Sequence, residues 1–214
     1  MRETRRIVLF GPQGSGKGTQ AEMLAKKYKL NILATGEFFR QEIKKGTDLG
    51  NLAEKFIEKG KLVPDVITNR VIFDELGQKK YSAGFILDGY PRNLNQLDFL
   101  EKNFGLDRII QLDIDDKMVI KRLGGRRICP NCGAIYHLEN RPPDKKGICD
   151  ICGADLVVRS DDRPEAIMRR LWIYHEQTEP ILDKYAKEKK LIKINANPSI
   201  EKVFSKIIKQ LEKK

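Results

Sequence analysis

A glycine-rich segment directly after a short apolar run constrains this chain more than any other feature. The run RRIVLF leads into GPQGSGKGTQ (residues 11–20), where Gly11, Gly14, Gly16 and Lys17 fit the G-x4-G-K part of a P-loop. Glycines let consecutive backbone amides turn inward around an anion, and the N-terminus of a following helix points partial positive charge at the same place. The segment therefore predicts a phosphate-binding loop between a strand and a helix.

Two other interpretations of this segment compete with the P-loop. A dinucleotide-binding fingerprint, G-x-G-x-x-G, would need a third glycine where Thr19 follows Gly14 and Gly16, so that pattern fails. A bare structural turn is the remaining alternative, but strand, loop, lysine and helix all stand in P-loop register. Gly18 occupies the position where the full pattern has Ser or Thr, a direct Mg²⁺ ligand. We therefore expect Mg²⁺ to be held mainly by phosphates and water.

Short apolar runs alternate with helical patterns along most of the chain. Five runs rich in Ile, Val, Leu and Phe are typical of parallel strands covered on both faces: residues 6–10, 31–34, 85–88, 108–113 and 191–195. Apolar residues at helical spacing occupy residues 17–27, 65–76, 94–103 and 164–189. This order predicts an α/β fold in which helices flank a parallel five-stranded sheet through right-handed crossovers.

Two segments interrupt this alternation. Residues 35–63, here called the flap, carry two helical patterns split by KKGTDLG, where one crossover helix would suffice. Residues 125–163, here called the lid, are rich in Gly, Pro, Asp and Cys and show almost no apolar periodicity. We expect both to be mobile insertions in a single core domain made of residues 1–34, 64–124 and 164–214.

The overall charge points to an anionic partner. Lys+Arg number 41 and Asp+Glu 30 among 214 residues, a formal net charge of +11, which suggests nucleic acid, acidic lipid or phosphorylated small molecules. Many lysines stand in mixed patches such as KEKK, which are typical of solvated helix faces. No run approaches 18 apolar residues, and the glycine turn cuts the apolar N-terminal run short. We therefore expect a cytoplasmic protein with neither a membrane span nor a signal peptide.

All the cysteines lie in the lid, as Cys129-x2-Cys132 and Cys149-x2-Cys152 separated by 16 residues. This spacing is typical of a four-thiolate zinc site, and the glycine after each pair lets backbone amides bend toward sulfur. Four thiolates leave no open coordination position, so the predicted Zn²⁺ is structural and supplies folding energy to a segment poor in apolar residues. Disulfides or free thiols are the alternative, and His137 could replace one cysteine.

Several arginines stand in or near motifs rich in glycine, proline or aspartate. Phosphoryl transfer needs two substrates held in line and charge neutralised on the migrating group, and planar, bidentate guanidinium groups suit that task. The candidates are Arg40, Arg92, Arg126, Arg159 and Arg170. Each of them alone is more often a surface residue. Their occurrence together with a P-loop favours phosphoryl transfer.

Taken together, these motifs resemble the adenylate kinase family in its long form with a zinc-stapled lid. GPQGSGKGTQ resembles the family's G-x-P-G-x-G-K-G-T-Q, TGEFFR its T-G-D-x-x-R, GKLVPD its G-x-x-V-x-D, and DGYPRNLNQ its D-G-F-P-R-x-x-x-Q. RLGGRR and the cysteine stretch resemble the lid, and YHEQTEPILDKY resembles the closing helix. The resemblance, which runs from the first strand to about Asn197, implies reversible phosphoryl transfer from MgATP to AMP, giving two ADP.

The resemblance also implies roles for individual residues. Charge on the transferred group would be met by Lys17, Arg92, Arg126, Arg159 and Arg170. ATP would be bound by Gly14, Ser15, Gly16, Lys17, Gly18, Thr19, Arg122, Arg126, Ile135, Tyr136 and Asn197. AMP would be bound by Thr35, Arg40, Lys61, Leu62, Val63, Gly89, Tyr90, Pro91, Arg92, Gln96, Arg159 and Arg170. Asp88 would orient Mg²⁺ through water.

The departures from the family pattern are modest. Gln13 replaces the usual loop proline, Glu37 replaces Asp, and Tyr90 replaces Phe. Asn197 stands where some relatives have lysine near the adenine. None of these changes removes a charged group that the chemistry needs, although Gln13 could alter the stiffness of the loop.

Three alternatives to ATP:AMP transfer follow from the same residues. Thr35 and Gln96 favour adenine, but a kinase for UMP, CMP or GMP would use the same chemistry. A zinc-ribbon nucleic-acid binder fits the charge and the cysteines, yet it would not require the P-loop, and the lid lacks interleaved aromatics for base stacking. A P-loop ATPase switch would need a direct Ser/Thr magnesium ligand. We expect a monomer that takes ATP, AMP and ADP, without nucleic-acid or membrane partners.

Overall fold

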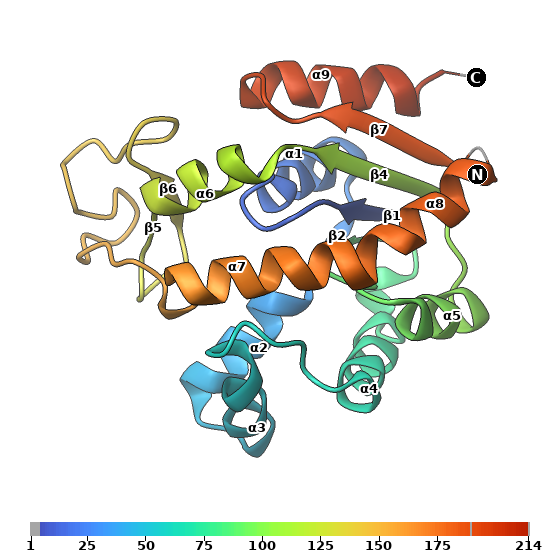
Figure 1. Cartoon of the computed structure of the whole chain (residues 1–214), viewed down its shortest axis with the longest axis horizontal. Helices are drawn as coiled ribbons and strands as arrows, with labels where there is room; N and C mark the ends of the chain where they lie inside the picture. The colour runs from blue at the N-terminus through green and yellow to red at the C-terminus, as the bar shows by residue number, and fades with distance from the viewer. Residues whose placement is uncertain (1–4, 189, 214) are drawn as a thin grey trace.

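The computed structural model describes residues 5–188 and 190–213, and a parallel sheet forms its centre (Figure 1). Five strands pair in the order β2-β3-β1-β4-β7, and every pair is parallel. The strands are β1 (Arg5–Phe10), β2 (Asn31–Ala34), β3 (Gly84–Asp88), β4 (Arg108–Asp113) and β7 (Leu191–Asn195). The prediction of a parallel five-stranded sheet is confirmed, with strand bounds within one residue of those expected.

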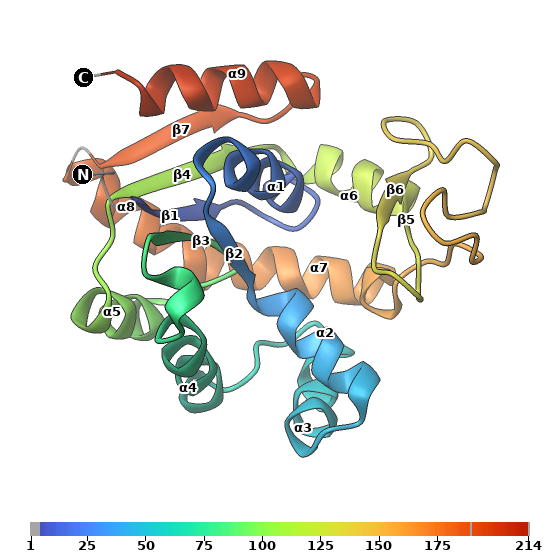
Figure 2. The ribbon, with the colours of Figure 1, turned by 180° about the vertical axis from the view of Figure 1, so that it is seen from behind.

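Helices cover both faces of the sheet (Figures 1 and 2). Val8 and Phe10 of β1 pack with α4, α5 and α8, whereas Ile7 and Leu9 of the same strand pack with α1 and α9 on the opposite face. A strand that is apolar on both sides can be buried only between two layers of helices. The helices of these layers are α1 (Lys17–Tyr28), α4 (Asp65–Leu76), α5 (Leu94–Asn103), α8 (Glu179–Lys187) and α9 (Ile200–Leu211).

Two helices lie outside the sequence prediction, α6 (Asp116–Gly125) and α9. Each begins with a side chain that caps a free backbone amide. Asp115 accepts a hydrogen bond from the Met118 amide at 2.8 Å, and Ser199 accepts one from the Lys202 amide at 3.4 Å. An Asp or Ser just before a helical pattern is a recognised helix start signal. The sequence therefore contains a signal for the beginning of both helices.

The helix predicted over residues 164–189 is interrupted in the structure. α7 (Pro164–Ile173) passes into a π-helical turn, Tyr174–Thr178, before α8 begins. Pro180 stands in the first turn of α8. Because proline has no N–H and its ring clashes with the carbonyl four residues earlier, an ordinary α-helical register cannot run through it. Residue 189 lies outside the described residues.

The flap and the lid leave the sheet as separate excursions (Figure 1). The flap holds the two predicted helices, α2 (Thr35–Lys45) and α3 (Asp48–Ile57). The lid holds a small antiparallel pair, β5 (Arg126–Ile128) and β6 (Ile135–His137), which its sequence did not reveal. Within residues 5–188 and 190–213, no helix combines the length and the apolar character needed to cross a bilayer.

Candidate active site

A cleft of about 1020 Å³ opens where β1 and β3 end, the edge at which open α/β sheets bind ligands. The core, the flap and the lid all line this cleft. The predicted residues on its walls are Gly14, Ser15, Gly16, Lys17, Gly18, Thr19, Arg40, Leu62, Asp88, Gly89, Pro91, Arg92, Arg122, Arg126, Ile135, Tyr136, Arg159, Arg170 and Asn197. The structure therefore brings together every residue that was predicted to bind ATP.

The loop between β1 and α1 has the bends that its glycines predict. Gly14 and Gly16 adopt φ angles of +76° and +97°, in the left-handed region that favours glycine. Lys17 opens α1 and folds back over the loop, where its Nζ donates hydrogen bonds to the carbonyls of Gly11 at 2.8 Å and Pro12 at 2.9 Å. The ammonium group is thus held at the mouth of an amide-lined turn, where a phosphate would meet it.

The charge of Lys17 is disfavoured by its surroundings. Burial lowers the pKa of Lys17 to about 8, three nearby arginines act in the same direction, and Asp88 opposes them. Asp88 ends β3 beside the loop, and an ideal β-carbon at Gly18 would lie 3.6 Å from its Oδ2. The position at which the full P-loop pattern carries a hydroxyl therefore faces a carboxylate. A buried cation of this kind gains stability when a phosphate arrives.

Two arginines of the cleft are held by consecutive buried aspartates. Arg126 makes a two-pronged ion pair with Asp162, in which its Nε donates at 2.7 Å. Arg170 donates to Oδ2 of Asp161 at 3.1 Å and to the carbonyl of the same residue at 3.0 Å. Such charge-assisted bonds fix a guanidinium group in one orientation. The two aspartates thus hold both arginines where they line the cleft.

The positively charged side chains of the cleft lie close enough to lower one another's pKa values. Arg92 donates from Nε to the carbonyl of Gly89 at 2.7 Å. Burial lowers the pKa of Arg92 to about 10, and Arg170 adds to the effect. Burial likewise lowers the pKa of Arg159 to about 10, with further contributions from two other arginines. Like charges in a buried space are costly unless anions join them, so this region is built for a polyanion.

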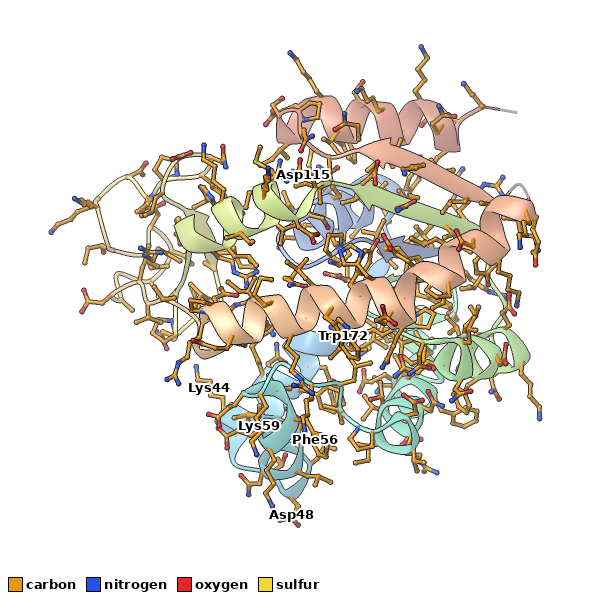
Figure 3. All side chains as sticks on the ribbon, viewed as in Figure 1. Lys44, Asp48, Phe56, Lys59, Asp115 and Trp172 are labelled. Carbon is orange, nitrogen blue, oxygen red and sulfur yellow. The ribbon has the colours of Figure 1, made fainter. Side chains whose placement is uncertain are left out.

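The flap and the lid meet across the cleft. Oε2 of Glu37, in the flap, lies 3.1 Å from Nη2 of Arg40 and 4.0 Å from Nη2 of Arg159, in the lid. Lys44, labelled in Figure 3 on the flap, donates to the lid carbonyls of residues 130 and 131 at 3.0 and 2.9 Å. These contacts describe a conformation in which the two insertions are closed over the site.

A second, smaller pocket of about 50 Å³ adjoins the cleft on the flap side. Thr35 donates to the carbonyl of Gly89 at 2.8 Å, and the side chain of Gln96 is fixed between Asp65 (2.7 Å) and the backbone amide of Arg92 (2.8 Å). The predicted AMP-binding residues that line the pocket are Thr35, Lys61, Leu62, Val63, Gly89, Arg92 and Gln96. Arg92 lines both spaces and therefore stands at their junction.

The four cysteines of the lid form one cluster. Their sulfur atoms all lie within 4.8 Å of one another, with pairs at 3.4 Å (Cys129–Cys152) and 3.5 Å (Cys132–Cys149). Four sulfurs bound tetrahedrally at roughly 2.3 Å from one ion would stand about 3.8 Å apart, so the group fits Zn²⁺. His137 is not part of the cluster, because its Nδ1 accepts from the backbone amides of residues 139 and 140.

Comparison with known proteins decides the family. A family model described as adenylate kinase matches residues 9–190. The adenylate kinase of Thermoanaerobacter sp. (strain X514) is 44% identical over 211 residues, which cover 96% of this chain and 97% of that protein. The adenylate kinase of Clostridioides difficile (strain 630) is 41% identical over 211 residues, covering 96% and 98%. The chain belongs to the adenylate kinase family.

Tyr90 is placed differently from the other residues that the adenylate kinase motifs predicted to bind AMP. It is 1% exposed and lines neither the cleft nor the small pocket. Its hydroxyl lies 2.7 Å from Oδ1 of Asn69 and 3.0 Å from the carbonyl of Gln96, and burial raises the pKa of the phenol. Tyr90 therefore supports Gln96 from beneath the pocket, where Phe in the family motif could make no hydrogen bond.

Three side chains that hold the adenylate kinase site together were not predicted. Asp65, the last residue of GKLVPD, fixes Gln96, and its place in that motif could have identified it. Thr178, in the π-helical turn, donates to the carbonyl of Arg92 at 2.8 Å. Gln13, in the P-loop, donates to a carbonyl of α7. The last two bonds join residues far apart in the chain, and no local sequence pattern predicts such pairs.

Proposed function

We propose that the protein transfers the γ-phosphoryl group of MgATP to AMP and back, with two ADP as the product. The proposal is carried by the cations gathered where the cleft meets the small pocket. Arg92 lines both spaces, and Lys17, Arg126, Arg159 and Arg170 line the cleft beside it. ATP would lie along the P-loop and AMP would lie where the cleft meets the flap-side pocket, so that their phosphates meet head to head at this cluster.

The cluster supports transfer by positioning and by charge. Arg126 and Arg170 are already oriented by Asp162 and Asp161, so they would meet the charge of the migrating group without reorganising. Lys17 would bridge to the transferred phosphoryl from the P-loop side. No general base is needed, because the accepting phosphate of AMP is already an anion. The protein's contribution is then to hold donor and acceptor in line.

Closure of the flap and the lid supports transfer to AMP over hydrolysis. The contacts of Glu37 with Arg159 and of Lys44 with residues 130 and 131 join the flap to the lid. A closed site excludes the water that would otherwise accept the phosphoryl group, and it keeps the lid arginines beside the P-loop.

The residues present fit both expected metals. Mg²⁺ would arrive with ATP and neutralise phosphate charge, and Asp88 would orient its water from the end of β3. Gly18 offers no hydroxyl for direct ligation, so the carboxylate is the protein group facing that position. Zn²⁺ would be held by the four lid sulfurs, which leave no open position for chemistry.

Adenine is the base that we propose for the acceptor, on the strength of Thr35 and the fixed amide of Gln96. UMP, CMP and GMP are the competing acceptors, and steady-state rates with ATP and each monophosphate decide among them. AMP should give the highest kcat/KM. A higher value for another monophosphate would assign the pocket to that base and leave the transfer chemistry intact.

The decisive experiment uses ADP as the only nucleotide. ADP with Mg²⁺ should yield ATP and AMP in equal amounts, and EDTA should stop the reaction. Lys17→Ala should lower turnover about 1000-fold or more, as expected when a group acting on the transferred phosphoryl is lost. Lys209→Ala, on an exposed face of α9, is the matched control. Absence of AMP from the wild-type reaction would reject the proposal.

We also propose that one chain in the cytoplasm is the working unit. The support is that the core, flap and lid of a single chain line the whole cleft. Sedimentation of the active enzyme at assay concentration tests the oligomeric state, and a dimer with lower activity on dilution would contradict it.

A further inference from the structure

One hydrogen bond ties the phosphate loop directly to the helix that follows the lid. Nε2 of Gln13 donates to the carbonyl of Ile167, in α7, at 2.9 Å. The two residues are 154 positions apart in the chain, and the bond is partly buried. Gln13 also lines the cleft, so it borders both α7 and the space in which phosphates would lie.

The loop rests on the packing between α6 and α7. An ideal β-carbon at Gly14 would lie 3.2 Å from the side chain of Leu123 in α6. Leu123 belongs to an apolar cluster that also contains Ile167 and Leu171 of α7. The loop therefore contacts α6 through a close glycine approach and α7 through the Gln13 amide. The second contact is specific, because it depends on a donor that only some side chains possess.

The acceptor carbonyl lies close to a residue of the cation cluster. Arg170 follows Ile167 by three residues on α7, and α7 begins directly after the lid. A bond at Ile167 thus links the loop that carries Lys17 to the helix that carries Arg170. The family motif has proline where this chain has Gln13, and proline cannot make such a bond.

We propose that Gln13 is a positioning residue that registers the phosphate loop against α7, so that Lys17 and Arg170 act on the same phosphates. Gln13 touches no reacting atom in this role and works through the loop and the helix. The inference rests on the proposed function, and it places the effect on the ATP side of the reaction. Apart from Arg159 and Arg170, the residues expected to hold AMP are in the flap or belong to the segment from Gly89 to Gln96, and the side chain of Gln13 bonds Ile167 instead.

The test replaces the amide without changing the length of the side chain. Gln13→Met keeps a flexible four-atom arm and removes the donor, which should raise the KM for ATP about two- to tenfold, the range for one neutral hydrogen bond. The KM for AMP should change less than twofold, and the melting temperature should fall by about 1–6 °C for a bond of this size. Gln78→Met, which removes an exposed amide bonded to Glu75, is the matched control and should change neither KM.

A double-mutant cycle distinguishes positioning from mere stabilisation. If Gln13 acts through Arg170, then Gln13→Met should cost much less in an Arg170→Lys background than in the wild type. Additive effects, equal shifts in the two KM values, or an unchanged KM for ATP would overturn the inference. Calorimetric titration with ATP and Mg²⁺ tests it independently of turnover, with the same two- to tenfold weakening expected. If the wild type showed no turnover, the proposed function would be refuted. If ATP bound to Gln13→Met as tightly as to the wild type, this inference alone would be refuted.

Discussion

The flap and the lid close over the same cleft, but different forces hold each of them together. The flap has an apolar cluster, in which Phe39, Ala53 and Val63 are buried together with Val71 of α4, and α2 and α3 pack against each other. The helices approach so closely at Gly50 that a β-carbon there would lie 2.3 Å from the backbone of Glu42. In the lid, the buried apolar cluster consists only of Cys129, Tyr136 and Cys149.

From this difference we predict that the flap folds by burying hydrocarbon, whereas the lid would need a metal on its four cysteines. Each half of the cysteine cluster repeats one small turn, in which the residue after the second cysteine donates back to the first: Gly133 to Cys129, and Gly153 to Cys149. Short turns of this kind bury too little surface to stay folded by themselves. Four predictions probe the contrast, from the largest expected effect to the smallest.

Metal removal should separate the two insertions most clearly. Binding of structural Zn²⁺ contributes on the order of 10 kcal/mol in small zinc-dependent folds, so Cys129→Ser or a strong chelator should unfold the lid locally. Amide hydrogen exchange should then lose protection between residues 126 and 159 while α2 and α3 keep theirs. Thermal stability should fall more than turnover measured in the cold, because a metal held by four thiolates would have no open position for chemistry. Retained protection in a metal-free lid, or loss in the flap as well, would contradict the comparison.

Phe39→Ala should have the converse effect. Phe39 is 3% exposed, and removal of a buried phenylalanine costs about 3–5 kcal/mol of stability. The flap should lose exchange protection and the KM for AMP should rise at least about tenfold, while the lid and its metal content stay unchanged. Phe73→Ala, at an exposed phenylalanine of α4, is the control and should cost less. A metal-dependent loss in Phe39→Ala would show that the flap does not stand alone.

A rise in pH above 8 should raise the KM for ATP while the KM for AMP stays constant. Lys17, whose pKa burial lowers to about 8, is charged below that pH and loses its proton as the pH rises through it. ATP binding must then restore the proton, so the KM for ATP should rise up to about tenfold per pH unit above pH 8. Arg92 has a pKa lowered only to about 10 and stays charged, so the KM for AMP should be flat from pH 8 to 9. Lys17→Arg should abolish the pH dependence of ATP binding, and its persistence there would assign it to another group.

The sequence predicted those parts of the molecule in which a local pattern determines the structure. Apolar runs predict the five strands, glycine spacing predicts the P-loop, and paired cysteines predict the cysteine cluster. Each of these patterns spans only a few residues. The π-helical turn and the lid strands did not, because a single Pro180 shifts the helix register and three-residue strands are too short to show a period. Bonds such as Thr178 to Arg92 pair distant residues, and only the folded chain reveals them.

Lys44 joins the two insertions and should give the smallest effect of the four. Its ammonium group bonds the carbonyls of residues 130 and 131, inside the turn that runs from Cys129 to Cys132. A metal that orders this turn also orders the acceptors of Lys44, which couples lid folding to flap closure. Because the contact is exposed, Lys44→Ala should raise the KM for AMP at saturating ATP only about two- to fivefold.

Lys45→Ala provides the matched control for this contact, since Lys45 pairs with Glu42 inside the flap and should leave the KM for AMP unchanged. The coupling is measured by combining Lys44→Ala with metal removal. If the metal acts on AMP binding through the Lys44 contact, the second change should add little to the first. Fully additive effects would mean that flap closure does not depend on the metal in the lid. The two insertions would then act independently in AMP binding, just as different forces stabilise each of them.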